Sequence, residues 1–194
     1  MTEKEKMLAG ELYFACDEEL SSMHQRAVCL CEKLKSSALC GEEREKTIRE
    51  LFGKCGSNPA VTPGFCCDYG SNIEVGDNFY CNYNVVILDV CKVKIGNNCL
   101  IGPQVGIYAA CHPLDREVRA SGAEFGKPVT IGNDCWIGGG AVINPGVTLG
   151  DNVVVGSGAV VTKSFPSDVI IAGNPAKIIK RLKADAPSNG VAKV

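Results

Sequence analysis

The chain has 194 residues and a mass of 20.5 kDa, which suits one domain with a small appendage. Its 20 Lys and Arg against 22 Asp and Glu give a formal net charge of −2, so no global positive field favours nucleic acid or an anionic membrane as a partner. No apolar run approaches the roughly 20 residues that span a bilayer, and the charged start of the chain does not resemble a signal peptide. We therefore expect a soluble, cytoplasmic protein.

The cysteine and histidine content excludes two further classes. There are 12 cysteines but no Cys-x-x-Cys pair, and only two histidines, which argues against both a disulfide framework and a structural metal site. The 22 glycines, together with only 6% aromatic residues, favour a turn-rich and regularly coiled architecture. We predict no metal centre, and the residues assign no role to the cysteines.

The first sixty residues predict helices. Apolar side chains recur at spacings of three and four from Met7 to Leu34, and a second such run spans about 42–53. Glycines and prolines then break the helical pattern. We assign residues 1–60 to an N-terminal helical segment and interpret His24 within it as a structural residue.

A six-residue repeat dominates the following part of the chain. Steps of six from Ile131 reach an aliphatic residue each time as far as Val161, and Gly or a small polar residue comes next. A period of six fits neither a helix nor an alternating strand, but it suits a prism-shaped solenoid with three hexads in each coil. We predict this solenoid over 61–172, with Cys99 and Cys135 buried at small-residue corners.

The phase of the repeat locates an inserted loop. Ile107 and Ile131 are separated by a whole number of hexads, so the loop over 108–128 leaves the solenoid and rejoins it in register. Val75 is two residues out of phase with Ile95, which predicts a small insertion in one coil. Long loops that leave a rigid scaffold often carry function.

His112 lies where the regular hexads stop, at the head of this polar loop. An imidazole has an unperturbed pKa of about 6.5 and can act as a general base near neutral pH. From the residues alone, a loop histidine that only caps backbone groups remains an alternative.

Motifs along nearly the whole chain carry a family resemblance. They resemble the hexapeptide-repeat sugar O-acetyltransferases, and most closely those of the maltose type. The motifs are EKEKMLAGELY (3–13), DYGSNI (68–73), FYCNYN (79–84), ILDV (87–90), HPLD (112–115), the run over 121–163, and AGNPAKIIKRL (172–182).

The resemblance implies a fold, an assembly and an activity. The fold would be mainly β: a left-handed parallel β-helix with a short C-terminal helix over 173–183 and a flexible tail over 184–194. The protein would be a homotrimer with active sites between neighbouring prisms. It would transfer acetyl from acetyl-CoA, without a metal, to a hydroxyl of a glucosyl sugar such as maltose or glucose, at C6.

The resemblance also assigns the catalytic groups. It places the family's general base on His112, which would take the proton of the sugar hydroxyl as that hydroxyl attacks the thioester. Glu124 would either orient the imidazole or bind the sugar. The backbone N–H of Gly139 would stabilise the negative charge that develops on the thioester oxygen.

The acceptor and cofactor positions follow in the same way. Asn82 and Asp89 fall at acceptor-binding positions, with Tyr80 and Asp68 beside them. Trp136 would either pack on the pantetheine arm of acetyl-CoA or fill a coil corner. The other predicted cofactor contacts are Ser157, Thr162, Lys163, Lys177 and Lys180.

Two departures from the galactoside-type pattern favour a maltose-type acceptor. Val90 stands where galactoside-type enzymes carry a second acid. Ala15, in the N-terminal helical segment (called the leader below), replaces an acidic contact. Two alternatives stay open: an acetyltransferase for another acceptor, such as a galactoside or an oligosaccharide, and a non-catalytic binding module. His112, Asn82 and Asp89 argue against the module, and the residues do not identify the physiological acceptor.

Overall fold

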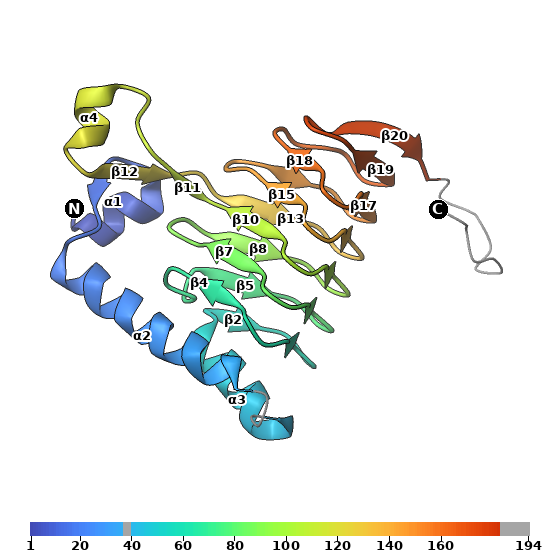
Figure 1. Ribbon diagram of the computed structural model, residues 1–194, viewed down its shortest axis with the longest axis horizontal. Coiled ribbons are helices and arrows are strands. Elements are labelled where there is room, and N and C mark those ends of the chain that lie inside the picture. Colours follow the sequence, from blue (N-terminus) through green and yellow to red (C-terminus); the bar gives the residue numbers. More distant parts are fainter. Residues whose placement is uncertain (37–39, 183–194) are drawn as a thin grey trace.

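The computed structural model describes residues 1–36 and 40–182. Short strands wind into a three-sided stack of coils, and helices from the leader lie along one side of it (Figure 1). The predicted left-handed parallel β-helix with an N-terminal helical segment is confirmed. The predicted tail over 184–194 lies outside the described residues.

The leader is divided by a short strand that the apolar spacing did not predict. A capping box at Thr2 starts the first helix, and Gly10 ends it with a left-handed φ of 76°. Asp17 caps the second helix by accepting hydrogen bonds from two of its backbone amides. The elements are α1 (Glu3–Ala9), β1 (Tyr13–Phe14), α2 (Glu18–Lys35) and α3 (Gly41–Leu51).

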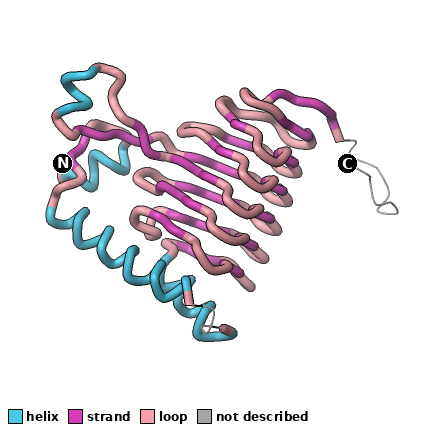
Figure 2. The backbone as a smooth tube through the Cα atoms, in the orientation of Figure 1, coloured by secondary structure: helices cyan, strands magenta, loops and turns pink. Residues whose placement is uncertain are grey.

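The coils form three parallel sheets, one on each side of the prism (Figure 2). Sheet I contains β2 (Lys54–Cys55), β5 (Ile73–Val75), β8 (Val93–Ile95), β13 (Val129–Ile131) and β16 (Thr148–Leu149). Sheet II contains β3 (Ala60–Val61), β6 (Tyr80–Cys81), β9 (Leu100–Ile101), β14 (Trp136–Ile137), β17 (Val153–Val155), β19 (Val169–Ala172) and β20 (Lys177–Arg181). Sheet III contains β4 (Cys66–Cys67), β7 (Val86–Leu88), β10 (Gly106–Tyr108), β15 (Val142–Ile143) and β18 (Val160–Val161).

Two predicted boundaries are wrong. The solenoid starts with β2 rather than at residue 61, because Lys54 and Cys55 already pair with β5. The C-terminal helix predicted over 173–183 is instead the strand β20, which pairs antiparallel with β19. This pairing covers the open edge of sheet II and uses backbone groups that β19 would otherwise leave without partners.

The repeating aliphatic positions form the core of the prism. Ile95, Ile131 and Leu149 stack in register on sheet I, and each is at most 3% exposed. Cys99 and Cys135 are also buried, as predicted for small residues at the corners. The hexads therefore supply a continuous apolar column that supports the outer edges of the prism.

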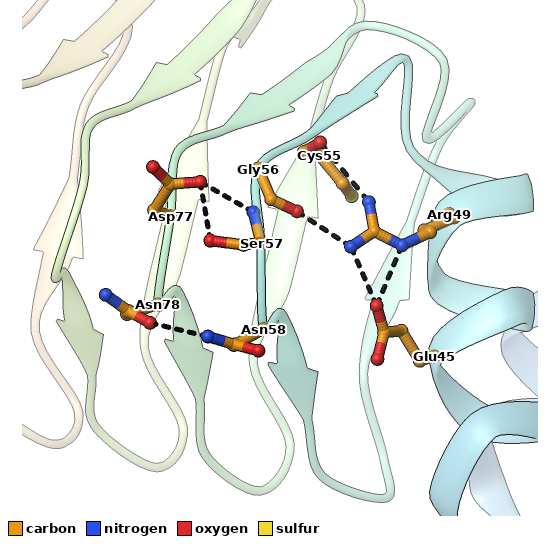
Figure 3. A network of polar contacts seen from close by, with 8 residues as sticks. All are labelled: Glu45, Arg49, Cys55, Gly56, Ser57, Asn58, Asp77 and Asn78. Atoms are coloured by element: carbon orange, nitrogen blue, oxygen red, sulfur yellow. Dashed lines mark hydrogen bonds and ion pairs between the residues drawn. The ribbon is translucent and has the colours of Figure 1, made fainter.

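Side-chain amides link the coils at the corner between sheets I and II. Asn58 donates to Asn78 at 3.1 Å (Figure 3), and Asn78 donates to Asn98 at 2.9 Å. All three residues have a left-handed φ of 52–56°. Asparagine tolerates this backbone region better than most residues. Arg49 of α3 joins the leader to the first coil through the carbonyl groups of Cys55 and Gly56.

Every departure from the six-residue spacing falls at the corner after sheet III. Pairing of Lys54 with Glu74 and of Glu74 with Lys94 makes two coils 20 residues long, where one such insertion was predicted. The next coil includes the long loop and spans 36 residues, the one after it spans 18, and the last spans 16. The long loop leaves from the same corner, and it contains β11 (Ala110–Cys111), α4 (Arg116–Ala120) and β12 (Ala123–Gly126).

The loop is tied to the leader through a small sheet. Strand β12 pairs antiparallel with β11 on one side and with β1 on the other. The leader thus reaches the corner where the loop departs (Figure 1). Within the described ranges, no helix is long and apolar enough to cross a membrane.

Candidate active site

A cavity of about 520 Å³ lies at the corner after sheet III. Strands β4, β7 and β10 end there, so the residues that follow them converge with the loop and the leader. The cavity brings together three predicted site residues, Asp68, His112 and Glu124. Its other lining residues are Tyr13, Ala15, Ser21, His24, Gln25, Tyr69, Leu88, Val90 and Ala110.

His112 presents an accessible imidazole at this cavity. The residue is exposed, and no described residue forms a hydrogen bond with its ring. Glu124 is half-buried in the same cavity, but its Oε2 accepts a hydrogen bond of 2.9 Å from the hydroxyl of Tyr13. The predicted pair is brought together, and the carboxylate is held by the leader rather than by the imidazole.

Asp68 is the second carboxylate in the cavity. Burial and, to a smaller extent, the nearby Asp89 raise its pKa to about 6, and His24 opposes the increase. Because this pKa is about 6, the charge of Asp68 changes with pH just below neutral.

Asp89 has a structural position instead of the predicted contact with an acceptor. Its side chain is fully buried, and its Oδ1 accepts hydrogen bonds from the backbone N–H groups of Asp68 and Tyr69, at 3.1 and 2.9 Å. Its Oδ2 accepts from the backbone N–H of Asn72 at 3.2 Å. Burial raises the pKa of Asp89, and these backbone hydrogen bonds oppose the increase. Asp89 therefore shapes the two-residue insertion that carries Asp68.

The leader contributes residues that the sequence analysis missed. His24 was interpreted as structural, but it lines the cavity, and its Nδ1 lies 2.8 Å from the carbonyl oxygen of Asp68. A carbonyl only accepts, so this ring nitrogen carries the proton. Ser21, His24 and Gln25 share one face of α2, and this polar stripe at helical spacing was the available signal.

A second group of predicted residues lies at the opposite edge of sheet III, at the corner with sheet II. Asn82 follows β6, Gly139 follows β14 and Ser157 follows β17, so their turns stack along one edge. The N–H of Gly158 donates to the carbonyl of Gly139 at 2.9 Å. No described residue accepts a hydrogen bond from the N–H of Gly139, which leaves this donor available to a ligand.

The remaining predicted cofactor positions are divided between the two edges. Trp136 is 46% exposed on the outer face of sheet II, beside the Gly139 turn, so it does not fill a coil corner. Lys177 and Lys180 are exposed on β20 at the end of the same sheet. Thr162 and Lys163 instead follow β18, at the corner that carries the His112 cavity.

Comparisons with known proteins place this arrangement in a family. Residues 6–56 match the maltose acetyltransferase hexapeptide capping motif, and 128–163 match the bacterial transferase hexapeptide family with six repeats. A hexapeptide repeat of succinyl-transferase matches 92–107. A putative acetyltransferase of Dictyostelium discoideum is 52% identical over 94% of this chain and 95% of its own length.

The chain belongs to the hexapeptide-repeat acetyltransferases.

The structure of this acetyltransferase is also similar to two solved structures. A maltose O-acetyltransferase from Clostridium difficile has a TM-score of 0.92 and 47% identity, covering 94% of this chain and 98% of its own. A galactoside acetyltransferase in complex with coenzyme A has a TM-score of 0.90 and 41% identity, covering 94% and 92%. Within the residues described here, no group of three or more His, Cys, Asp or Glu side chains is arranged to hold a metal ion.

Proposed function

We propose that this acetyltransferase moves an acetyl group from acetyl-CoA to the C6 hydroxyl of a glucosyl sugar such as maltose or glucose. The observation that carries the proposal is the cavity in which an accessible imidazole, His112, faces two carboxylates, Asp68 and Glu124. Carboxylates accept hydrogen bonds from the several hydroxyls of a sugar, and the imidazole accepts a proton from one of them.

The reaction is a direct transfer. Neutral His112 takes the hydroxyl proton while the sugar oxygen forms a bond to the thioester carbonyl carbon. The carbonyl oxygen becomes negative in the tetrahedral intermediate, and we assign a hydrogen bond to this oxygen to the N–H of Gly139, which no described residue uses. The C–S bond then breaks, and the imidazolium returns the proton to the thiolate of coenzyme A.

Acetyl-CoA as the donor is supported by the relatives and by the surface of the chain. A relative with 41% identity is known in complex with coenzyme A. The edge that carries Gly139 and Ser157 continues to the exposed lysines of β20, Lys177 and Lys180, which suit phosphate groups. Trp136 offers an exposed ring for the pantetheine arm on the same face.

The positions of the two edges support a homotrimer. His112 and Gly139 lie at opposite edges of sheet III, so one chain does not bring the base and the oxyanion donor together. A second prism beside the first would place its Gly139 edge against the His112 edge of its neighbour. Tyr80, Leu100 and Trp136 form an exposed apolar row in register on sheet II, which suits contact with such a neighbour. We expect this assembly to work in the cytoplasm.

An acceptor panel tests the proposal. Purified protein receives acetyl-CoA with maltose, glucose or a galactoside, and release of free thiol is followed with a colour reagent. We expect turnover on the glucosyl sugars, and the variant His112→Ala should lose about 10²- to 10⁴-fold in kcat while remaining folded and trimeric. Full activity in that variant would contradict the role of the base.

Two other outcomes separate the alternatives. Faster turnover of a galactoside or an oligosaccharide would change the acceptor and leave the chemistry intact. Absence of thiol release with every sugar would favour a non-catalytic binding module.

A further inference from the structure

One hydrogen bond connects the leader to the catalytic loop at the edge of the cavity. Tyr13 of β1 is in register with Glu124 of β12, 111 residues further along the chain. The hydroxyl of Tyr13 donates to Oε2 of Glu124 at 2.9 Å. The two-residue ladder between β1 and β12 fixes the backbones on both sides of this contact.

Tyr13 is a rigid and permanent donor. Its side chain is fully buried, and it packs with the buried side chains of Met7, Leu20, Tyr69 and Val90. Burial, together with the nearby Glu124, raises the pKa of Tyr13 well above its usual value, so the phenol keeps its proton over the whole working pH range. The donor is therefore held by packing and keeps its proton.

Glu124 is left with one oxygen for a ligand. A carboxylate accepts hydrogen bonds at two oxygens. Among the described residues, only Tyr13 donates a hydrogen bond to the side chain of Glu124. Glu124 is half-buried and lines the same cavity as His112. With Oε2 held, rotation of the carboxylate is restricted and Oε1 has a fixed direction.

We propose that Tyr13 is a positioning residue, which holds Glu124 so that Oε1 accepts a hydrogen bond from a hydroxyl of the acceptor. This inference rests on the proposed function, because it assumes that the cavity binds a sugar. It assigns Glu124 to acceptor binding rather than to orienting His112, since the contact that Glu124 makes is with the leader. The leader thereby contributes to acceptor affinity through one phenol group.

A double-mutant cycle tests the proposal. Tyr13→Phe keeps the buried ring and removes only the hydroxyl, and it is compared with Glu124→Ala and with the double variant. We expect Tyr13→Phe to raise KM for the acceptor about fivefold, with kcat and KM for acetyl-CoA nearly unchanged. In the Glu124→Ala background the same change should have no further effect on KM.

A structural role would give a different pattern. If the hydroxyl only fastens the leader to the loop, Tyr13→Phe would lower the melting temperature and leave KM for the acceptor unchanged, which would overturn the proposal. Tyr83→Phe is the matched control, because Tyr83 is an exposed phenol that does not line this cavity. It should leave all three kinetic constants unchanged.

A second measurement does not depend on turnover. A crystal structure of Tyr13→Phe should show the carboxylate of Glu124 rotated or in more than one position, while the backbones of β1 and β12 remain paired. A carboxylate that stays in its original position would overturn the proposal. Absence of turnover in the unmodified enzyme would instead contradict the proposed function, so the two failures are distinguishable.

Discussion

Asp68 is a carboxylate whose burial in the cavity lowers stability once it is charged. Its pKa is about 6 in the folded protein, above the value of about 4 expected when it is unfolded. The folded state therefore holds the proton more tightly, and the free energy of unfolding should fall as the pH rises from about 4 to 6 and then level off.

The variant Asp68→Asn tests this dependence. It removes the ionising group, so we expect it to flatten the pH profile and to raise the free energy of unfolding at pH 7 by about 1–3 kcal/mol. Urea unfolding at one fixed protein concentration from pH 4 to 8 measures both effects. Parallel profiles for the two proteins would contradict the assigned pKa.

Asp89 should act on stability more than on the acceptor. Asparagine at this position replaces one acceptor oxygen with a donor, so at least one of the backbone N–H groups of Asp68, Tyr69 and Asn72 loses its partner. We expect Asp89→Asn to lower the free energy of unfolding by about 1–3 kcal/mol. An acceptor KM that rises strongly with no loss of stability would restore the predicted direct contact.

At the level of elements, each corner asparagine should contribute to stability in two ways: through its side-chain hydrogen bonds and through its tolerance of the left-handed backbone. Asn78→Gly keeps access to the left-handed φ of 56° but removes the hydrogen bonds to Asn58 and Asn98. Asn78→Ala removes the same bonds and adds backbone strain. We expect the alanine variant to be less stable than the glycine variant by about 1 kcal/mol in urea unfolding. Equal stabilities would show that the backbone carries no strain there.

The sequence predicted the N-terminal helices and the strands that repeat, and it missed the short strands outside the repeat. The hexads from Ile131 to Val161 predict the sheets because the same inward position recurs in every coil. β1 has two residues, too few for any period to appear. The helix expected at β20 came from the family resemblance, whereas the open edge of β19 makes this segment a strand.

The same limit applies to the candidate site. His112 was predicted because it marks the point where a regular pattern stops, and its place in the cavity agrees with that signal. Tyr13 and His24 were not predicted as site residues, because their roles arise from contacts with residues far along the chain. Asp89 was assigned to the acceptor from its motif, and only the three-dimensional structure shows that it is buried.

On the scale of the whole molecule, the apolar row on sheet II should hold the proposed trimer together. Leu100 is 49% exposed between Tyr80 and Trp136. A carboxylate in the middle of such a contact is costly to bury, so we expect Leu100→Glu to dissociate the protein into monomers. Light scattering after size-exclusion chromatography measures the mass, and circular dichroism checks that the coils remain folded. A monomeric unmodified protein, or an unchanged trimer in this variant, would contradict the assembly.

In the proposed trimer, His112 of one subunit acts on an acceptor bound beside the Asn82 and Gly139 edge of its neighbour. The most direct test mixes the variants His112→Ala and Asn82→Ala, each nearly inactive alone, in equal amounts under conditions that exchange subunits. Random mixing gives both intact groups to about a quarter of the interfaces, so we expect acetyl transfer to recover to about a quarter of the original rate. A mixture that stays as inactive as its two components would show that the groups act within one chain and would contradict the account.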